Sequence, residues 1–316
     1  MGGEVLRFLA ASASLVALGA IACISQPEFV CTANTDCLSE SSALGICEAN
    51  GSCSFYDAAC AGSLRRYADG APGALASACV SAGAQCVAQL AMGTSHSCAL
   101  RSDGTVWCWG LNADGQVGDG TTSDRSSPTL VQGLPAGRKA TQIAADQANT
   151  CALLDDHTVW CWGLDDAKNL GQCGTSRPPR STTPVQVPTW TPNAETPGAP
   201  SCDASTPFTA TQIALGGEHA CAIGTDARLH CWGENAMGKQ GGQCGQDPAI
   251  FDDVPGPLPV AFDGAVQVAC GDEYSCVLKD ENSVWCFGAN DLHELGNGDT
   301  AASFVPVNVS GISDAK

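Results

Sequence analysis

Cysteine offers the most chemistry in this chain, because 20 of its 316 residues are of this type. Eight of them form four pairs with a constant spacing of ten positions: Cys98 and Cys108, Cys151 and Cys161, Cys221 and Cys231, and Cys276 and Cys286. Regularly spaced cysteines either form disulfides or bind a metal ion. Zinc needs four ligands that converge on one point, whereas this spacing brings only two together. We therefore predict four disulfides and no metal site.

Each cysteine pair flanks a predicted β-hairpin. Residues 98–100 and 106–109 are short apolar runs that suit a half-buried strand, and the turn between them contains Asp103 and Gly104. A three-residue loop centred on Asp103 places the two cysteines directly opposite each other, where a disulfide forms without backbone movement. The same block recurs three more times, with turns centred on Asp156, Asp226 and Glu281.

The hairpins belong to a larger repeating unit of short strands. An alternating strand such as 87–90 precedes each hairpin, and a proline-interrupted outer strand such as 127–131 follows it. The first cysteines of successive hairpins are 53, 70 and 55 positions apart. Several short strands at a period of about 50 residues are typical of a β-propeller blade. We predict an all-β fold with four blade units: 87–137, 138–209, 210–263 and 264–316.

The segment from Ser102 to Gly118 resembles the regulator of chromosome condensation repeat. The characteristic places of that repeat are filled by Gly110, Asn112, Gly115, Gln116 and Gly118, and later units keep Gly233, Asn235, Gly238 and Gly241, then Gly288, Asn290 and Gly296. The resemblance covers about residues 87–310 and implies a β-propeller. Closed propellers of this family usually carry seven blades. Four units leave a fragment, an open arc, a small closed ring and half of a dimer as alternatives.

Charge and cysteine content restrict the setting in which the chain works. The net charge is −19, with 14 basic against 33 acidic residues, which argues against binding to nucleic acid or to anionic membranes. Abundant paired cysteines are typical of an oxidising compartment. Arg7 and the apolar run 8–22 predict a secretory signal at 1–22. Small residues before Cys23 resemble a bacterial lipoprotein box, so we expect export and a lipid on Cys23 as the one membrane attachment.

Residues 23–86 are predicted to form a small cysteine-rich module with a linker, stapled by disulfides because so short a segment buries little core. The pairings 31 with 47, 37 with 53 and 60 with 79 are one of several connectivities. Cys86 pairs with Cys23 only if Cys23 carries no lipid. Metal binding is the alternative, but the segment contains no histidine.

The long second period comes from a proline-rich insertion at 174–209, bracketed by Cys173 and Cys202. Proline removes amide donors, so we expect a surface loop tethered by a Cys173–Cys202 disulfide, not an extra blade strand. Cys244 and Cys270 are predicted as the remaining bridge. A tethered loop on a regular scaffold is a common place for binding specificity, although a tolerated insertion without a role explains it equally well.

No catalytic constellation appears in the sequence. His96 and His219 share one register, where the other units have Asn149 and Tyr274, so we interpret them as structural hydrogen-bonding residues. His230 takes the place of a tryptophan. The acidic residues of the first unit, Asp103, Asp114, Asp119 and Asp124, are interpreted as turn formers in preference to a calcium site. The recurring tryptophans favour packing between blades over a carbohydrate platform.

These observations predict an exported or cell-surface binding protein without catalytic residues or cofactor, which uses propeller-face loops to bind a protein or surface ligand. A carbohydrate-binding or hydrolytic propeller of the cell envelope is the alternative. The family includes a guanine-nucleotide exchange factor that acts at chromatin. We do not expect that activity here, because the chain is acidic and predicted to be exported. An incomplete propeller would also favour self-association.

Overall fold

The computed structural model describes residues 46–47, 53–56, 65–67, 87–174, 178–193, 195–196, 198–235 and 241–312. The chain divides into two compact units, Met1–Cys86 and Val87–Lys316. In the first unit, β1 (Ile46–Cys47), β2 (Cys53–Tyr56) and β3 (Arg65–Tyr67) form a sheet in that order. The predicted signal, the lipid on Cys23 and the bridges of residues 23–86 lie outside the described residues.

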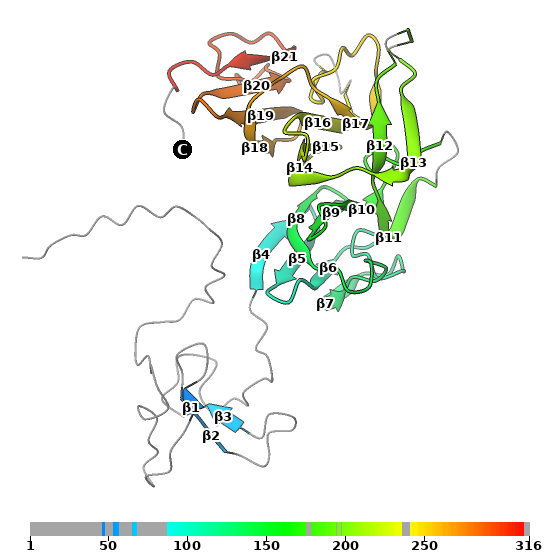
Figure 1. Ribbon diagram of the computed structural model, residues 1–316, viewed down its shortest axis with the longest axis vertical. Coiled ribbons are helices and arrows are strands. Elements are labelled where there is room, and N and C mark those ends of the chain that lie inside the picture. Colours follow the sequence, from blue (N-terminus) through cyan, green and yellow to red (C-terminus); the bar gives the residue numbers. More distant parts are fainter. Residues whose placement is uncertain are drawn as a thin grey trace, which may run out of the picture. The chain divides into compact units, whose positions relative to one another are not determined.

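The second unit contains four sheets of four antiparallel strands, each in sequence order, and we call them blades 1 to 4 (Figure 1). Blade 1 comprises β4 (Val87–Met92), β5 (His96–Arg101), β6 (Val106–Gly110) and β7 (Arg125–Leu130), and blade 2 comprises β8 (Ala140–Asp146), β9 (Asn149–Leu154), β10 (Val159–Leu164) and β11 (Arg180–Gln186). Blade 3 comprises β14 (Ala210–Gly216), β15 (His219–Gly224), β16 (Leu229–Glu234) and β17 (Asp253–Pro259), and blade 4 comprises β18 (Ala265–Cys270), β19 (Tyr274–Lys279), β20 (Val284–Gly288) and β21 (Ser303–Asn308). The predicted all-β fold with four propeller blades is confirmed.

The first strands of successive blades lie side by side, in the order β4, β8, β14 and β18 (Figure 1). A glutamine side chain joins each strand to the next. The Gln89 amide donates to the Ile143 carbonyl at 2.8 Å and accepts from the Ile143 N–H at 2.8 Å. Gln142 bonds Ile213 in the same way, at 2.9 and 3.0 Å. Gln212 accepts from the N–H of Val268 at 2.9 Å. We call this contact the glutamine clamp.

Aromatic side chains of the third strands fill the space between blades. Trp162, Trp232 and Phe287 share one register and are almost fully buried. Trp162 Nε1 donates to the carbonyl of Gln116 in the preceding blade at 2.9 Å, and Trp232 Nε1 donates to that of Asn169 at 2.9 Å. A buried ring with its N–H bonded supports packing between blades, as the recurrence of tryptophan indicated.

The hairpin turns share a polar relay. In blade 1, Asp103 Oδ1 accepts from the Thr105 N–H and hydroxyl, and Trp107 Nε1 donates to the Thr105 hydroxyl at 3.1 Å. Blade 2 repeats this relay through Asp156, Thr158 and Trp160. Blade 3 has no such threonine, and His230 Nε2 reaches Asp226 directly at 3.1 to 3.2 Å. His230 therefore replaces the tryptophan of the relay.

The insertion differs from the surface loop that its prolines predict. Its first part is β11, the outer strand of blade 2, and its second part forms a separate two-stranded sheet of β12 (Pro188–Thr191) and β13 (Ser201–Pro207). The prediction of a loop was therefore wrong. Pro188 opens β12 and Pro207 closes β13, so these prolines stand at strand ends, where a missing N–H is tolerated.

One hairpin turn places a non-glycine residue in the left-handed backbone conformation. Ala227 has φ 62° in the blade 3 turn, where blade 1 has Gly104 at φ 86°. The left-handed conformation costs a non-glycine residue about 1–2 kcal/mol, partly offset by the greater freedom of glycine in the unfolded chain. We expect Ala227→Gly to raise the free energy of unfolding by about 0.5–1 kcal/mol. The urea midpoint measures this, and Ala222→Gly in buried β15 is the control that should destabilise.

Candidate functional site

The insertion hairpin (Pro188–Pro207) is held against the outer edge of blades 2 and 3. Trp190 Nε1 donates to the Gly171 carbonyl at 2.9 Å, and a disulfide joins Cys173 to Cys202. A Cβ atom added at Gly256 in β17 would lie 2.1 Å from Trp190 Nε1. The absence of a side chain at Gly256 thus allows the indole to lie directly on the outer strand of blade 3.

An apolar groove of about 370 Å³ lies beside this hairpin. We call it the insertion groove. It is lined by Pro192, Asn193, Gly245, Gln246, Asp247, Ile250, Phe251, Leu258, Ala261, Phe304, Val305 and Pro306. Phe251 and Leu258 are buried, whereas Ile250, Phe304 and Val305 remain 48%, 38% and 55% exposed. Three exposed large apolar side chains around one groove are a typical sign of an interaction surface.

A second pocket, of about 320 Å³, contains Trp190, Phe208 and His230. His230 Nδ1 lies 3.2 Å from the Pro257 carbonyl, its Nε2 faces Asp226, and the ring packs on Phe208 at 5.0 Å. Both ring nitrogens are therefore engaged by the fold. These contacts fix the orientation of the His230 ring in the pocket.

Two carboxyl groups meet where β15 begins and β16 ends. Burial, and after it the charge of Glu218, raises the pKa of Glu234 to about 8, and the two side chains are hydrogen-bonded. Burial and Asp166 also raise the pKa of Glu218. Like charges so close share a proton. Neither Glu218 nor Glu234 was predicted from the sequence. His219 lies opposite Gly233 in the antiparallel pairing, and this places Glu218, one residue before His219, beside Glu234, one residue after Gly233.

The two register histidines lie between blades. His96 Nε2 is 2.8 Å from the Thr150 hydroxyl, and His219 Nε2 is 2.8 Å from the Ser275 hydroxyl. Burial lowers the pKa of each imidazole to about 4. A buried, neutral ring that bonds the next blade agrees with the structural interpretation of these residues.

Each hairpin cysteine pair is disulfide-bonded, with Cα atoms 4.1 Å apart: Cys98–Cys108, Cys151–Cys161, Cys221–Cys231 and Cys276–Cys286. The predicted Cys244–Cys270 bridge was wrong, since both are free thiols. Cys244 Sγ points to the Glu234 carbonyl at 3.2 Å, while Cys270 Sγ accepts from the Ser275 hydroxyl at 3.7 Å. The two sulfurs thus contact different groups, a backbone carbonyl and a hydroxyl.

Within the described residues, one group of potential metal ligands comes together: His219, Cys221 and Cys270. Cys221 is already bonded to Cys231, and His219 Nε2 faces the Ser275 hydroxyl. A thiolate ligand is thus not available from Cys221, and we assign no metal to this group.

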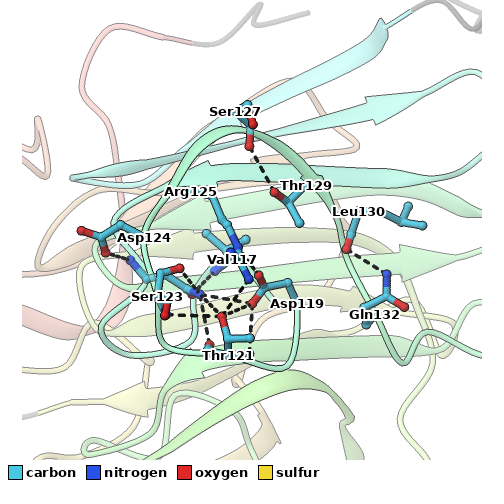
Figure 2. A network of polar contacts seen from close by, with 11 residues as sticks. Val117, Asp119, Thr121, Ser123, Asp124, Arg125, Ser127, Thr129, Leu130 and Gln132 are labelled. Carbon is cyan, nitrogen blue, oxygen red and sulfur yellow. Dashed lines mark hydrogen bonds and ion pairs between the residues drawn. The ribbon is translucent and has the colours of Figure 1, made fainter.

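The acidic loop of blade 1 is a structural network (Figure 2). Asp119 accepts from the Thr121 N–H and hydroxyl and pairs with Arg125. Asp124 accepts from the N–H of buried Asn112, whose amide also donates to the carbonyls of Thr121 and Ser123. These carboxylates shape a turn, which is the interpretation that the sequence favoured over calcium.

The buried asparagine recurs as the centre of later loops. Asn235 Oδ1 accepts from the Cys244 N–H at 3.1 Å and Asn290 Oδ1 accepts from the Leu295 N–H at 2.9 Å, as Asn112 Oδ1 does from Val117 at 2.9 Å. Models of the regulator of chromosome condensation (RCC1) repeat match residues 87–116, 103–153, 210–239 and 265–294. These matched stretches of the second unit are RCC1 repeats. The resemblance seen in the sequence is confirmed, and the asparagine of the repeat fixes the loop after the third strand in blades 1, 3 and 4. In blade 2, Asp165 takes its place, and its Oδ1 accepts from the Leu170 N–H at 3.0 Å.

Two curated proteins are similar in sequence to this chain. The ultraviolet-B receptor UVR8 of Arabidopsis thaliana is 28% identical over 230 residues, which are 72% of this chain and 47% of the receptor. The human regulator of chromosome condensation is 26% identical over 248 residues, which are 72% of this chain and 53% of that protein. The match spans about half the length of each relative.

Among solved structures, human WBSCR16 is similar with a TM-score of 0.58 and 19% identity. The likeness covers 78% of this chain and 62% of that chain, and it supports the propeller fold alone. No helix long and apolar enough to cross a membrane occurs in the part of the chain that the structure describes.

The shared proton predicts how stability depends on pH. Glu234 keeps its proton up to pH about 8 in the folded protein and loses it near 4.5 when unfolded. The folded state therefore binds more protons in this window, and the free energy of unfolding falls as the pH rises through it. Glu234→Gln should flatten that fall. Thermal unfolding across the window measures it, with exposed Glu195→Gln as the control that should change nothing.

Proposed function

We propose that this RCC1-repeat protein is an exported or cell-surface binding protein without catalytic activity, and that it holds a protein partner in the insertion groove. The exposed apolar side chains of Ile250, Phe304 and Val305 around a groove of about 370 Å³ carry the proposal. The relatives named as a receptor and as a regulator are compatible with a binding role. Guanine-nucleotide exchange is not part of the proposal.

The groove favours one kind of partner segment. Its volume suits one or two apolar side chains, and its rim carries Asp247 on a chain of net charge −19. A peptide segment with an apolar anchor and flanking lysine or arginine fits both properties, because opposite charge speeds encounter and apolar burial supplies affinity.

Peptide selection tests this proposal. The oxidised full chain is immobilised and a random peptide library is selected on it, with counterselection against Ile250→Glu. We expect peptides with an apolar anchor and basic neighbours. Their Kd should rise at least tenfold in Ile250→Glu and Val305→Glu, since burial of one such side chain is worth about 1.5–3 kcal/mol and about 1.4 kcal/mol is tenfold.

The matched control is Leu130→Glu, because Leu130 is also a partly exposed residue of an outer strand, in blade 1 and outside the groove. It should leave the Kd unchanged. Peptides that bind all three variants equally, or a selection that enriches none, would count against the groove as the binding site.

Export has a separate test. Support for it comes from the predicted signal at 1–22 and from five disulfides in the second unit, which persist in oxidising compartments. We expect an epitope-tagged chain in its native host to fractionate outside the cytoplasm with its hairpin cysteines blocked to alkylation. A reduced, cytoplasmic chain would contradict export and leave the groove test untouched.

A further inference from the structure

A free thiol replaces an apolar side chain at the junction between blades 3 and 4. Cys270 pairs with Ser275, the residue before the first hairpin cysteine of blade 4. The equivalent position is held by Met92 in blade 1, Ala145 in blade 2 and Leu215 in blade 3. The thiol is therefore a property of this junction and not of the repeat.

The Cys270 sulfur lies close to the hairpin disulfide of blade 3. The Cys270 Sγ, the Cys221 Sγ and a ring nitrogen of His219 all lie within 4.8 Å of one another. The absence of a side chain at Gly216 allows this approach, because a Cβ atom added there would lie 2.9 Å from the Cβ of Cys270. The Ser275 hydroxyl contacts both sulfurs, at 3.5 Å from Cys221 and 3.7 Å from Cys270. A thiol and a disulfide thus share one site.

The junction between blades 1 and 2 has the same arrangement without the thiol. His96 Nε2 lies 2.8 Å from the Thr150 hydroxyl, and the sulfur of bridged Cys98 lies 3.9 Å from that hydroxyl. Ala145 stands where Cys270 stands in blade 4. Blades 1 and 2 therefore provide a control within the same chain for any reaction of Cys270.

The junction between blades 3 and 4 lacks two hydrogen bonds that the other two junctions have. Within the described residues, Gln212 accepts from the Val268 N–H, but no acceptor is found for its amide N–H, whereas the other two clamps make both bonds. Phe287 also replaces the tryptophan whose Nε1 bonds a carbonyl of the preceding blade. A covalent bond between blades would have its greatest effect at this junction.

We propose that Cys270 exchanges with the hairpin disulfide of blade 3 and so joins blades 3 and 4 by a Cys221–Cys270 bridge. The Cys270 thiolate attacks Cys221 Sγ, the Cys221–Cys231 bond breaks, and Cys231 leaves as a thiolate that takes up a proton. One S–S bond forms as another breaks, and the proton lost by Cys270 balances the one gained by Cys231. The exchange consumes no oxidant or reductant, and it is independent of the partner at the insertion groove.

The surroundings of the sulfur make the exchange slow at neutral pH and faster at high pH. Burial raises the pKa of Cys270 to about 12, although the Ser275 hydroxyl lowers it, and Asp146 acts in the same direction as burial. His219 faces the sulfur as a neutral ring, since burial lowers its pKa to about 4, and burial also raises the pKa of nearby Cys244. Because the thiolate is the attacking form, the rate should rise about tenfold per pH unit below 12.

Disulfide mapping of the oxidised full chain tests the exchange. The folded chain is held at pH 6 and at pH 9, quenched with acid, alkylated with a maleimide and digested with pepsin without reductant. We expect the Cys221–Cys270 linkage and alkylated Cys231 to appear at pH 9 at least about a hundredfold faster than at pH 6. The rate should not depend on protein concentration, and Cys98–Cys108 should stay intact in the same sample.

Two reciprocal variants use the equivalent junction as a control. Cys270→Ala gives blade 4 the residue that blade 2 carries at the same position, and it should abolish the exchange without loss of the fold. Ala145→Cys places a thiol beside the Cys98–Cys108 bridge, and we expect a bridge from Cys98 to the introduced thiol to appear at pH 9.

A second pair of variants tests the geometry without competition from the native bridge. Cys231→Ala leaves Cys270 as the neighbour of Cys221, and the oxidised chain should contain the Cys221–Cys270 bridge at any pH. Cys108→Ala is the matched variant in blade 1, where Cys98 should remain a free thiol. Circular dichroism that matches the parent shows which variants are folded.

Three outcomes would overturn the proposal. The first is a folded parent chain in which Cys221 stays linked to Cys231 alone at every pH. The second is a folded Cys231→Ala chain in which Cys221 and Cys270 both remain reduced. The third is new linkages that form equally fast in Cys270→Ala, because they would come from general scrambling and not from this thiol.

Discussion

The glutamine clamp is the interaction on which the arrangement of this propeller depends. Strands of different blades do not pair with one another. Apart from single backbone bonds between loops and strands, such as Gly120 N–H to the Thr182 carbonyl, side chains set the relative position of the blades. Gln89 and Gln142 each exchange two hydrogen bonds with a backbone amide of the next blade. Each bond contributes about 0.5–1.5 kcal/mol, and loss of the side chain would leave a buried N–H without a partner, at a greater cost. The clamp therefore fixes how the first strands of neighbouring blades are aligned, and it also contributes to the free energy that holds the blades together.

Local features of the fold were readable from the sequence. Asp103 and Gly104 marked the hairpin, and the spacing of its cysteines placed them opposite each other, because both depend on residues less than a dozen positions apart. The family pattern identified Asn112 and the glycines of the loops. The four-blade division and the all-β class followed from the recurrence of these local signals.

Features that depend on distant residues were not readable. Gln89 acts on a residue 54 positions away, and nothing in the strand around it distinguishes a clamp from an exposed glutamine. The prolines of the insertion indicated a loop, but Trp190 packing over Gly256 and the Cys173–Cys202 bridge stabilise two strands there. Cys244 and Cys270 were paired by elimination, and counting cannot show that their sulfurs face different backbone and hydroxyl groups.

The hairpin disulfides stabilise each blade from within. A bridge that closes a loop of this length stabilises a chain by about 3 kcal/mol in the chain-entropy model, and each blade carries its own. Blade 1 keeps Cys98, Leu100 and Val106 buried although Leu90 in its first strand is 62% exposed. The disulfides thus stabilise each blade from within, whereas the glutamine clamp fixes the position of each blade against the next.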